Sequence, residues 1–160
     1  MVYHLQLNWF IVLRQTLEMK KKFKSILLID DNAADNRYNQ IILEELDIAE
    51  HVQVAETGEE ALKMLVNDEE HHPDLILLDI NMPKMNGWEF LEAYKKLAPE
   101  KNINDVVVVL TTSMNAADRK KAAQIPGIAE FDIKPLTPDI MHHIIEKYFP
   151  DLTPPLQEDL

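Results

Sequence analysis

The 160-residue chain contains no cysteine. Disulfide bonds, thiolate nucleophiles and cysteine-ligated metal sites are therefore excluded, and we expect the protein to be cytoplasmic. Basic residues are also scarce, because 16 Lys and Arg stand against 28 Asp and Glu and give a formal net charge of -12. Such a negative field repels nucleic-acid backbones and anionic membranes, and we expect neither to be a direct partner.

Long hydrophobic runs are missing as well. The apolar run at 9–13 is much shorter than the roughly 20 residues that span a membrane. It has no positive charge ahead of it and no small-residue cleavage site behind it, unlike a signal peptide. We therefore expect residues 1–22 to be a disordered or non-native extension, with a natural start at Met19; a hydrophobic docking segment is the alternative. Residues 150–160, with three prolines, are expected to form a flexible acidic tail without an effector domain.

Residues 23–149 contain five short apolar runs of strand length, which alternate with five segments of helical periodicity. The runs lie at 26–29, 52–55, 75–78, 106–110 and 128–133, and the helical segments lie at 36–46, 59–66, 88–97, 118–125 and 140–149. We expect Thr57 and Thr137 to cap two of the helices. The alternation predicts a single doubly wound α/β domain, with a five-stranded parallel sheet covered by helices on both faces.

Carboxylates follow two of the predicted strands. Asp30 and Asp31 come directly after the first strand, and Asp79 comes directly after the third. Ligands of doubly wound sheets bind outside the carboxyl ends of the strands, where the strand order reverses, and we expect these three side chains to converge there. Three carboxylates a few ångström apart repel one another unless a cation neutralises them. The sequence therefore predicts a divalent metal site.

Further residues complete a recognisable pattern. The loop Asp79-Ile80-Asn81-Met82-Pro83 is followed by Gly87, Thr111 ends the fourth apolar run, and Lys134-Pro135 follows the fifth. Together with Asp30-Asp31, this pattern resembles the receiver domain of response regulators, in particular single-domain receivers similar to the chemotaxis regulator. The resemblance covers roughly 24–149, nearly all of the domain expected at 23–149, and implies a flavodoxin-like (βα)5 fold with strand order 2-1-3-4-5.

The resemblance implies a single-domain response regulator of two-component or phosphorelay signalling. Such a protein accepts a phosphoryl group from a histidine kinase or a histidine phosphotransfer protein and then changes its binding to a downstream protein. Asp79 would be the phosphoacceptor, and Mg²⁺ would be held by Asp30, Asp31, Asp79 and the backbone carbonyl of Asn81. This oxygen-only ligand set suits Mg²⁺.

The resemblance also assigns the residues that would contact the phosphoryl group and respond to it. Thr111 would hydrogen-bond one phosphoryl oxygen, and Lys134 would contact another through its ammonium group, next to a Lys134-Pro135 bond that is prone to the cis form. Phe131 would act with Thr111 as an aromatic switch. A one-residue slip from Thr111 to Thr112 stays open at this stage.

Each of these residues also has an ordinary structural interpretation. Asp30 and Asp31 could cap the following helix, and Asp79 could form a turn before Pro83. Phe131 could be a half-buried strand aromatic without any switching role. Caps and turns do not, however, require three carboxylates to meet at one sheet edge opposite a lysine, which favours the functional interpretation of the whole set.

Three other functions compete with a live receiver. A phosphohydrolase similar to the haloacid dehalogenases would carry both acids after the first strand, whereas the nucleophile expected here follows the third. A nucleotide or flavin binder would need glycine and hydroxyl residues after Ile29, where this chain has Asp-Asp-Asn. A phosphorylation-independent binding module would keep the cleft only as a scaffold, and labelling with a small phosphodonor distinguishes it. We therefore expect no enzyme activity beyond the domain's own phosphorylation and dephosphorylation.

Overall fold

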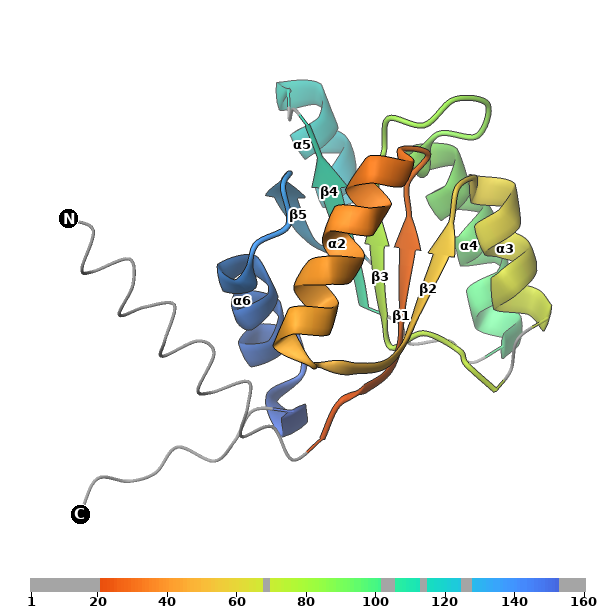
Figure 1. Ribbon diagram of the computed structural model, residues 1–160. Coiled ribbons are helices and arrows are strands. Elements are labelled where there is room, and N and C mark those ends of the chain that lie inside the picture. Colours follow the sequence, from red (N-terminus) through yellow and green to blue (C-terminus); the bar gives the residue numbers. More distant parts are fainter. Residues whose placement is uncertain (1–20, 68–69, 102–105, 113–114, 125–127, 153–160) are drawn as a thin grey trace, which may run out of the picture.

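Five parallel strands form the centre of the molecule, in the order β2-β1-β3-β4-β5 (Figure 1). The computed structural model describes residues 21–67, 70–101, 106–112, 115–124 and 128–152. The strands are β1 (Phe23–Ile29), β2 (Ala49–Ala55), β3 (Leu75–Leu78), β4 (Val106–Thr111) and β5 (Ile128–Ile133). Neighbouring strands pair in parallel throughout. The predicted doubly wound α/β fold and its strand order are confirmed.

One helix follows the carboxyl end of each strand. These helices are α2 (Ala33–Leu46), α3 (Gly58–Asn67), α4 (Gly87–Lys101), α5 (Ala116–Gln124) and α6 (Pro138–Tyr148). A polar side chain caps each helix by accepting a hydrogen bond from a backbone N–H of its first turn, and these caps are Asn32, Thr57, Asn86, Asn115 and Thr137. The predicted caps Thr57 and Thr137 are therefore confirmed.

Two hydrophobic cores lie on opposite faces of the sheet. The first joins apolar residues of α2 and α6 to alternate residues of β1 and β4, such as Leu28 and Leu110. The second joins α3 and α4 to the remaining strand residues, such as Ile29 and Val109. Because successive strand residues point to opposite faces, each central strand is buried on both sides. The sheet is thereby fixed in register, which fixes where its strand ends lie.

The two ends of the chain fall largely outside the described residues. Residues 1–20 and 153–160 are not described, so the extension and the tail stay predictions. The first residues assigned to the tail differ from that expectation, because Pro150–Leu152 form a short 3-10 helix, η1. Leu152 donates its N–H to the Phe149 carbonyl at 2.9 Å and packs against the first core. In the part of the chain that is described, no helix is long and apolar enough to cross a membrane.

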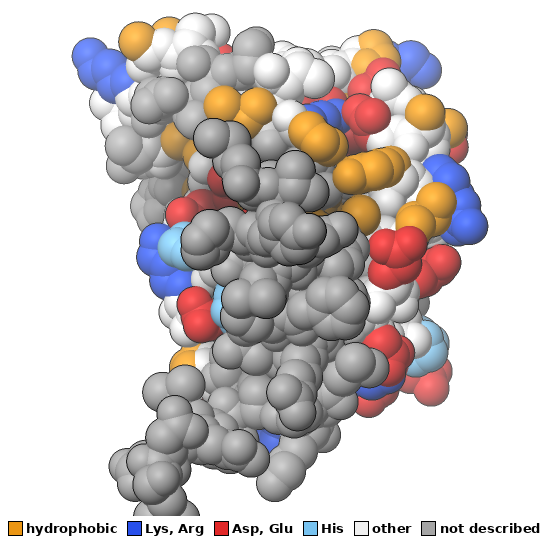
Figure 2. Space-filling model, turned by 60° about the vertical axis from the view of Figure 1, so that its left-hand side comes forward, with side chains coloured by type: hydrophobic (Ala, Val, Ile, Leu, Met, Phe, Trp, Pro, Cys, Tyr) orange, Lys and Arg blue, Asp and Glu red, His pale blue; other side chains and the backbone are white. Residues whose placement is uncertain are grey.

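The surface mixes charged and apolar groups. On the face seen in Figure 2, acidic and basic side chains are interspersed, and hydrophobic side chains gather in its upper right part. Tyr38 and Ile41 on α2 are the large exposed apolar side chains of that helix, 43% and 37% exposed. Tyr38 borders the sheet edge at which the carboxylates lie, as described below.

Candidate functional site

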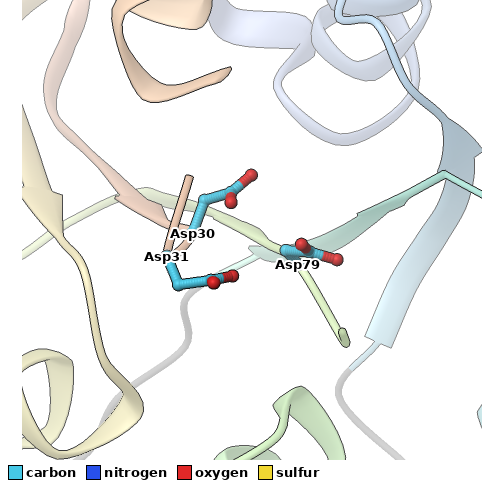
Figure 3. A group of neighbouring side chains, drawn as sticks. All are labelled: Asp30, Asp31 and Asp79. Atoms are coloured by element: carbon cyan, nitrogen blue, oxygen red, sulfur yellow. The ribbon is translucent and has the colours of Figure 1, made fainter. Parts of the chain in front are cut away.

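The predicted acidic residues meet at the carboxyl edge of the sheet. β1 ends at Ile29 and delivers Asp30 and Asp31, while β3 ends at Leu78 and delivers Asp79. The backbone of Asp79 is held to β1 by its N–H, which donates to the Ile29 carbonyl at 2.9 Å. One ligand oxygen from each of the three carboxylates lies within 4.8 Å of the others. Figure 3 shows the three side chains gathered at the ends of the two strands.

Lys134 enters the same cleft from the end of β5. Its backbone N–H donates to the Thr111 carbonyl at 2.9 Å, and the Lys134-Pro135 peptide bond is cis. Its Nζ lies 2.6 Å from Asp30 Oδ2, 2.8 Å from Asp35 Oδ2 and 3.1 Å from Asp79 Oδ2. An ammonium group has three N–H donors, so each donor of Lys134 has a carboxylate acceptor. Lys134 therefore cross-links the ends of β1, β3 and β5 with the start of α2.

Burial and pairing act in opposite directions on these charges. Burial raises the pKa of Asp30, and hydrogen bonds from Lys134 and from the Asn32 N–H offset this rise only in part. Burial alone would lower the pKa of Lys134, but its hydrogen bonds to Asp30 and Asp35 outweigh burial and hold this pKa well above the usual lysine range. Lys134 is thus a permanent cation at neutral pH.

The donor set fits a divalent cation. The carboxyl groups of Asp30, Asp35 and Asp79 contact the ammonium group of Lys134, and that of Asp31 lies close to those of Asp30 and Asp79. This excess of negative charge would be relieved by Mg²⁺, which prefers carboxylate, carbonyl and water oxygens. Asp31 is exposed while Asp30 and Asp79 are buried, so a cation can reach the cluster from solvent and keep part of its water shell.

Asn81 and Thr111 extend the network of polar groups around Asp79. The Asn81 N–H donates to Asp79 Oδ1 at 3.0 Å, and Asn81 Nδ2 donates to Thr111 Oγ1 at 3.0 Å. Thr111 is fully buried, whereas Thr112 is exposed and lines an adjoining cavity with Lys134 and Pro135. Thr111 is accordingly the threonine that shares a hydrogen-bond network with Asp79.

Phe131 lies outside the cleft. It is half-buried on β5 and stacks on Trp88 of α4, with ring centroids 5.8 Å apart. Lys121 of α5 places its Nζ 5.1 Å from the centre of the Trp88 ring. Phe131 therefore links β5 to α4, and its role as a switch stays a prediction.

The alternative structural interpretations hold only in part. Asn32, and neither Asp30 nor Asp31, caps α2, because Asn32 Oδ1 accepts from the Ala34 N–H at 2.9 Å. Asp30 Oδ1 does accept the Asn32 N–H at 2.9 Å, which shapes the turn between β1 and α2. Asp79 makes the equivalent bond to the N–H two residues on. Both buried acids therefore shape their turns and still present a second oxygen to Lys134.

The sequence analysis missed Asp35. The predicted helix began at residue 36, which left Asp35 in a loop, but α2 begins at Ala33 and places Asp35 in its first turn. Asn32 followed three residues later by Asp35 at a helix start is the available sequence signal, because an N-cap fixes which side chains point from the first turn. That signal does not identify Lys134 as the partner, 99 residues away.

Known proteins are similar to this chain in sequence. The family model described as "Response regulator receiver domain" matches residues 26–146. The Two-component response regulator ARR22 of Arabidopsis thaliana is 31% identical over 135 residues, covering 84% of this chain and 90% of that protein. The rice Two-component response regulator ORR1 is 34% identical over 116 residues, covering 69% of this chain. The matched region spans about half of that rice protein, 49% of its length.

Solved structures agree with the sequence relatives. A two component response regulator from Cytophaga hutchinsonii superposes with a TM-score of 0.73 at 29% identity, over 79% of this chain and 97% of that one. A CheY-like receiver domain protein from Methanospirillum hungatei JF-1 gives a TM-score of 0.65 at 29% identity, over 79% and 94% of the two chains. With the acidic cleft at the expected strand ends, these matches show that the chain belongs to the response regulator receiver domain family of two-component signalling.

Proposed function

We propose that this protein is a cytoplasmic phosphoacceptor of a two-component or phosphorelay system, in which Asp79 receives a phosphoryl group from a histidine kinase or a histidine phosphotransfer protein. The observation that carries the proposal is the environment of Asp79. It is buried at a strand end, with Lys134 Nζ 3.1 Å from one oxygen and the Asn81 N–H 3.0 Å from the other. The carboxylate is thus fixed in direction and faces groups that stabilise negative charge.

The reaction requires positioning and charge neutralisation more than bond chemistry from the protein. A carboxylate oxygen of Asp79 attacks the phosphorus of a phosphohistidine, the O–P bond forms as the P–N bond breaks, and the departing imidazole nitrogen takes up a proton. Mg²⁺ held by Asp30, Asp31, Asp79 and the Asn81 carbonyl would neutralise charge on the transferred oxygens. Lys134 contributes a second positive charge, 3.1 Å from Asp79 Oδ2.

The response to phosphorylation begins at Thr111. Its Oγ1 accepts a hydrogen bond from Asn81 Nδ2, and a hydroxyl can also donate, so a phosphoryl oxygen on Asp79 would draw it inward. Thr111 pairs with Ile133 on β5, and Phe131 lies two residues earlier on the same face of that strand. A movement of Thr111 therefore changes the packing next to Phe131 and Trp88, and through it the surface offered to a downstream protein.

Labelling with acetyl phosphate tests this proposal. We expect the wild-type protein with Mg²⁺ to gain the mass of one phosphoryl group, and we expect no gain when Mg²⁺ is removed by chelation. Asp79→Ala should abolish the gain because no other carboxylate of the cleft is held in the same way. Asp118→Ala, which changes an acid at the start of α5, is the matched control and should label normally. Intact-mass spectrometry measures all four samples.

Two results would contradict the proposal in different ways. A full adduct on Asp79→Ala would show that another residue is the acceptor. No adduct on the wild-type protein at saturating donor and Mg²⁺ would favour the phosphorylation-independent binding module, in which the cleft has only a structural role.

A further inference from the structure

Two helices of this protein begin with the same four residues, Asn-Ala-Ala-Asp, at 32–35 and 115–118. In both, the asparagine side chain accepts the N–H of the aspartate, at 3.2 Å for Asp35 and 2.8 Å for Asp118. The surroundings of the two aspartates differ. Asp35 Oδ2 lies 2.8 Å from Lys134 Nζ, whereas Asp118 forms no ion pair within the described part of the chain. The ion pair between Asp35 and Lys134 is therefore not a requirement of this helix start.

The contact matters because Lys134 has no spare donor. Its three N–H groups face three carboxylates, those of Asp30, Asp35 and Asp79. A phosphoryl group on Asp79 that accepts a hydrogen bond from Lys134 must take one of these donors. Phosphorylation of this cleft therefore includes an exchange of partners at Lys134.

Asp35 is the partner that can leave at the lowest cost. Its side chain is 38% exposed, against 5% for Asp30 and 7% for Asp79. It also lines an open cavity of about 240 Å³, which is bordered by Asp35, Tyr38, Asn39, Thr112, Lys134 and Pro135. A released Asp35 carboxylate can turn toward this space and be hydrated, whereas a released Asp30 carboxylate would stay buried away from water. The oxygen of Asp79 that now accepts from Lys134 loses its charge when the phosphoryl group is attached, so Asp35 and Asp30 are the two charged partners to compare.

We propose that Asp35 is a positioning residue that holds Lys134 in the unphosphorylated cleft and is displaced when the phosphoryl group arrives. Its charge competes with the phosphoryl oxygens for the same ammonium group and opposes the entry of a second anion. The contact between Asp35 and Lys134 must be broken before Lys134 can bind the phosphoryl group, and breaking it weakens the binding of that group. This inference rests on the proposed function, because it assigns a role toward the phosphoryl group on Asp79.

The test compares binding of beryllofluoride, a stable mimic of the phosphoryl group, to variants saturated with Mg²⁺. Asp35→Asn should bind it about fivefold more tightly than the wild-type protein, which is the scale of removing one partly exposed charge pair. The same variant should not bind Mg²⁺ more tightly, because removing a nearby negative charge favours the anion and not the cation. Asp35→Glu, which keeps the charge, should stay close to wild type. Calorimetric titration gives both affinities.

Asp118→Asn is the matched control, since it removes the same residue from the same four-residue start. It should leave the affinity for beryllofluoride unchanged. An equal rise in Asp118→Asn would mean that total charge, and not the Lys134 contact, causes the effect. An unchanged or weaker affinity in Asp35→Asn would also overturn the inference. If the wild-type protein itself does not bind beryllofluoride, the proposed function fails first and the inference falls with it.

A second measurement needs no variant. Carboxyl-carbon NMR of the wild-type protein should show the Asp35 signal moving toward that of Asp118, which is partly exposed and has the same cap, when beryllofluoride and Mg²⁺ are added. An Asp35 signal that does not move while the Asp79 signal does would show that Asp35 keeps its bond to Lys134, and the displacement would be refuted.

Discussion

The helices α2 and α5 start with the same sequence and the same cap, and both follow the carboxyl end of a sheet strand. The start of α2 follows β1, which lies between β2 and β3, where the strand order reverses. The start of α5 follows β4, beyond this point. Ligand sites of doubly wound sheets form at the reversal, and the carboxylates and Lys134 meet there. The difference between the two starts lies in the neighbouring strand ends and not in the helices.

The two helices also differ in how firmly they are held. α2 buries Asn36, Asn39, Ile42, Leu43 and Leu46. Among the α5 side chains that the structure describes, Ala122 packs against the second core and no large apolar side chain does so. Since local opening is easiest where few apolar contacts are lost, α5 should be the more mobile helix and α2 the fixed reference for the cleft.

The largest expected effect comes from removing Lys134, the cation that contacts Asp35 at the start of α2. Lys134→Met keeps most of the side-chain volume but leaves Asp30 and Asp79 as buried acids without a cationic partner, which should lower the free energy of unfolding by about 3 kcal/mol without Mg²⁺. Urea denaturation measures this change, and Mg²⁺ should recover part of it. Lys121→Met, on α5, is the control and should cost much less, because Lys121 is exposed and its contact among the described residues is with an aromatic ring. Equal losses in the two variants would remove the distinction between the sites.

A smaller effect is expected from the two identical caps. Asn32→Ala and Asn115→Ala each remove a capping side chain, a change that costs about 1 kcal/mol in a well-packed helix. The loss should appear in the urea midpoint for Asn32→Ala, because α2 is part of the core. For Asn115→Ala it should appear mainly as faster hydrogen exchange within α5, with a smaller change in midpoint. A larger midpoint change for Asn115→Ala would show that α5 is as strongly coupled to the core as α2.

Most of the fold follows from local patterns in the sequence. The buried central strand β3 coincides with its apolar run at 75–78. β1 and β2 begin three residues before their apolar runs, at Phe23 and Ala49, because strands also contain exposed polar residues such as Lys24 and His51. These residues carry no hydrophobic signal, since what places them in strands is pairing with a neighbouring strand.

Only part of the candidate site could be predicted from the sequence. Asp30, Asp31 and Asp79 could be placed together because parallel strands bring their carboxyl ends to one edge. The partnership of Asp35 with Lys134 could not, because it depends on the rotational phase of α2 and on the course of the chain after β5. The choice of Thr111 over Thr112 likewise depends on which side of β4 each residue faces, and one residue of slip reverses it.

One measurement addresses the acceptor directly. The wild-type protein is treated with acetyl phosphate and Mg²⁺ and reduced with borohydride, which converts an aspartyl phosphate to homoserine, and its peptides are then sequenced by tandem mass spectrometry. The structure predicts conversion at Asp79 and none at Asp30, Asp31 or Asp118. Conversion at any of these other aspartates in place of Asp79 would contradict the proposal that Asp79 is the phosphoacceptor.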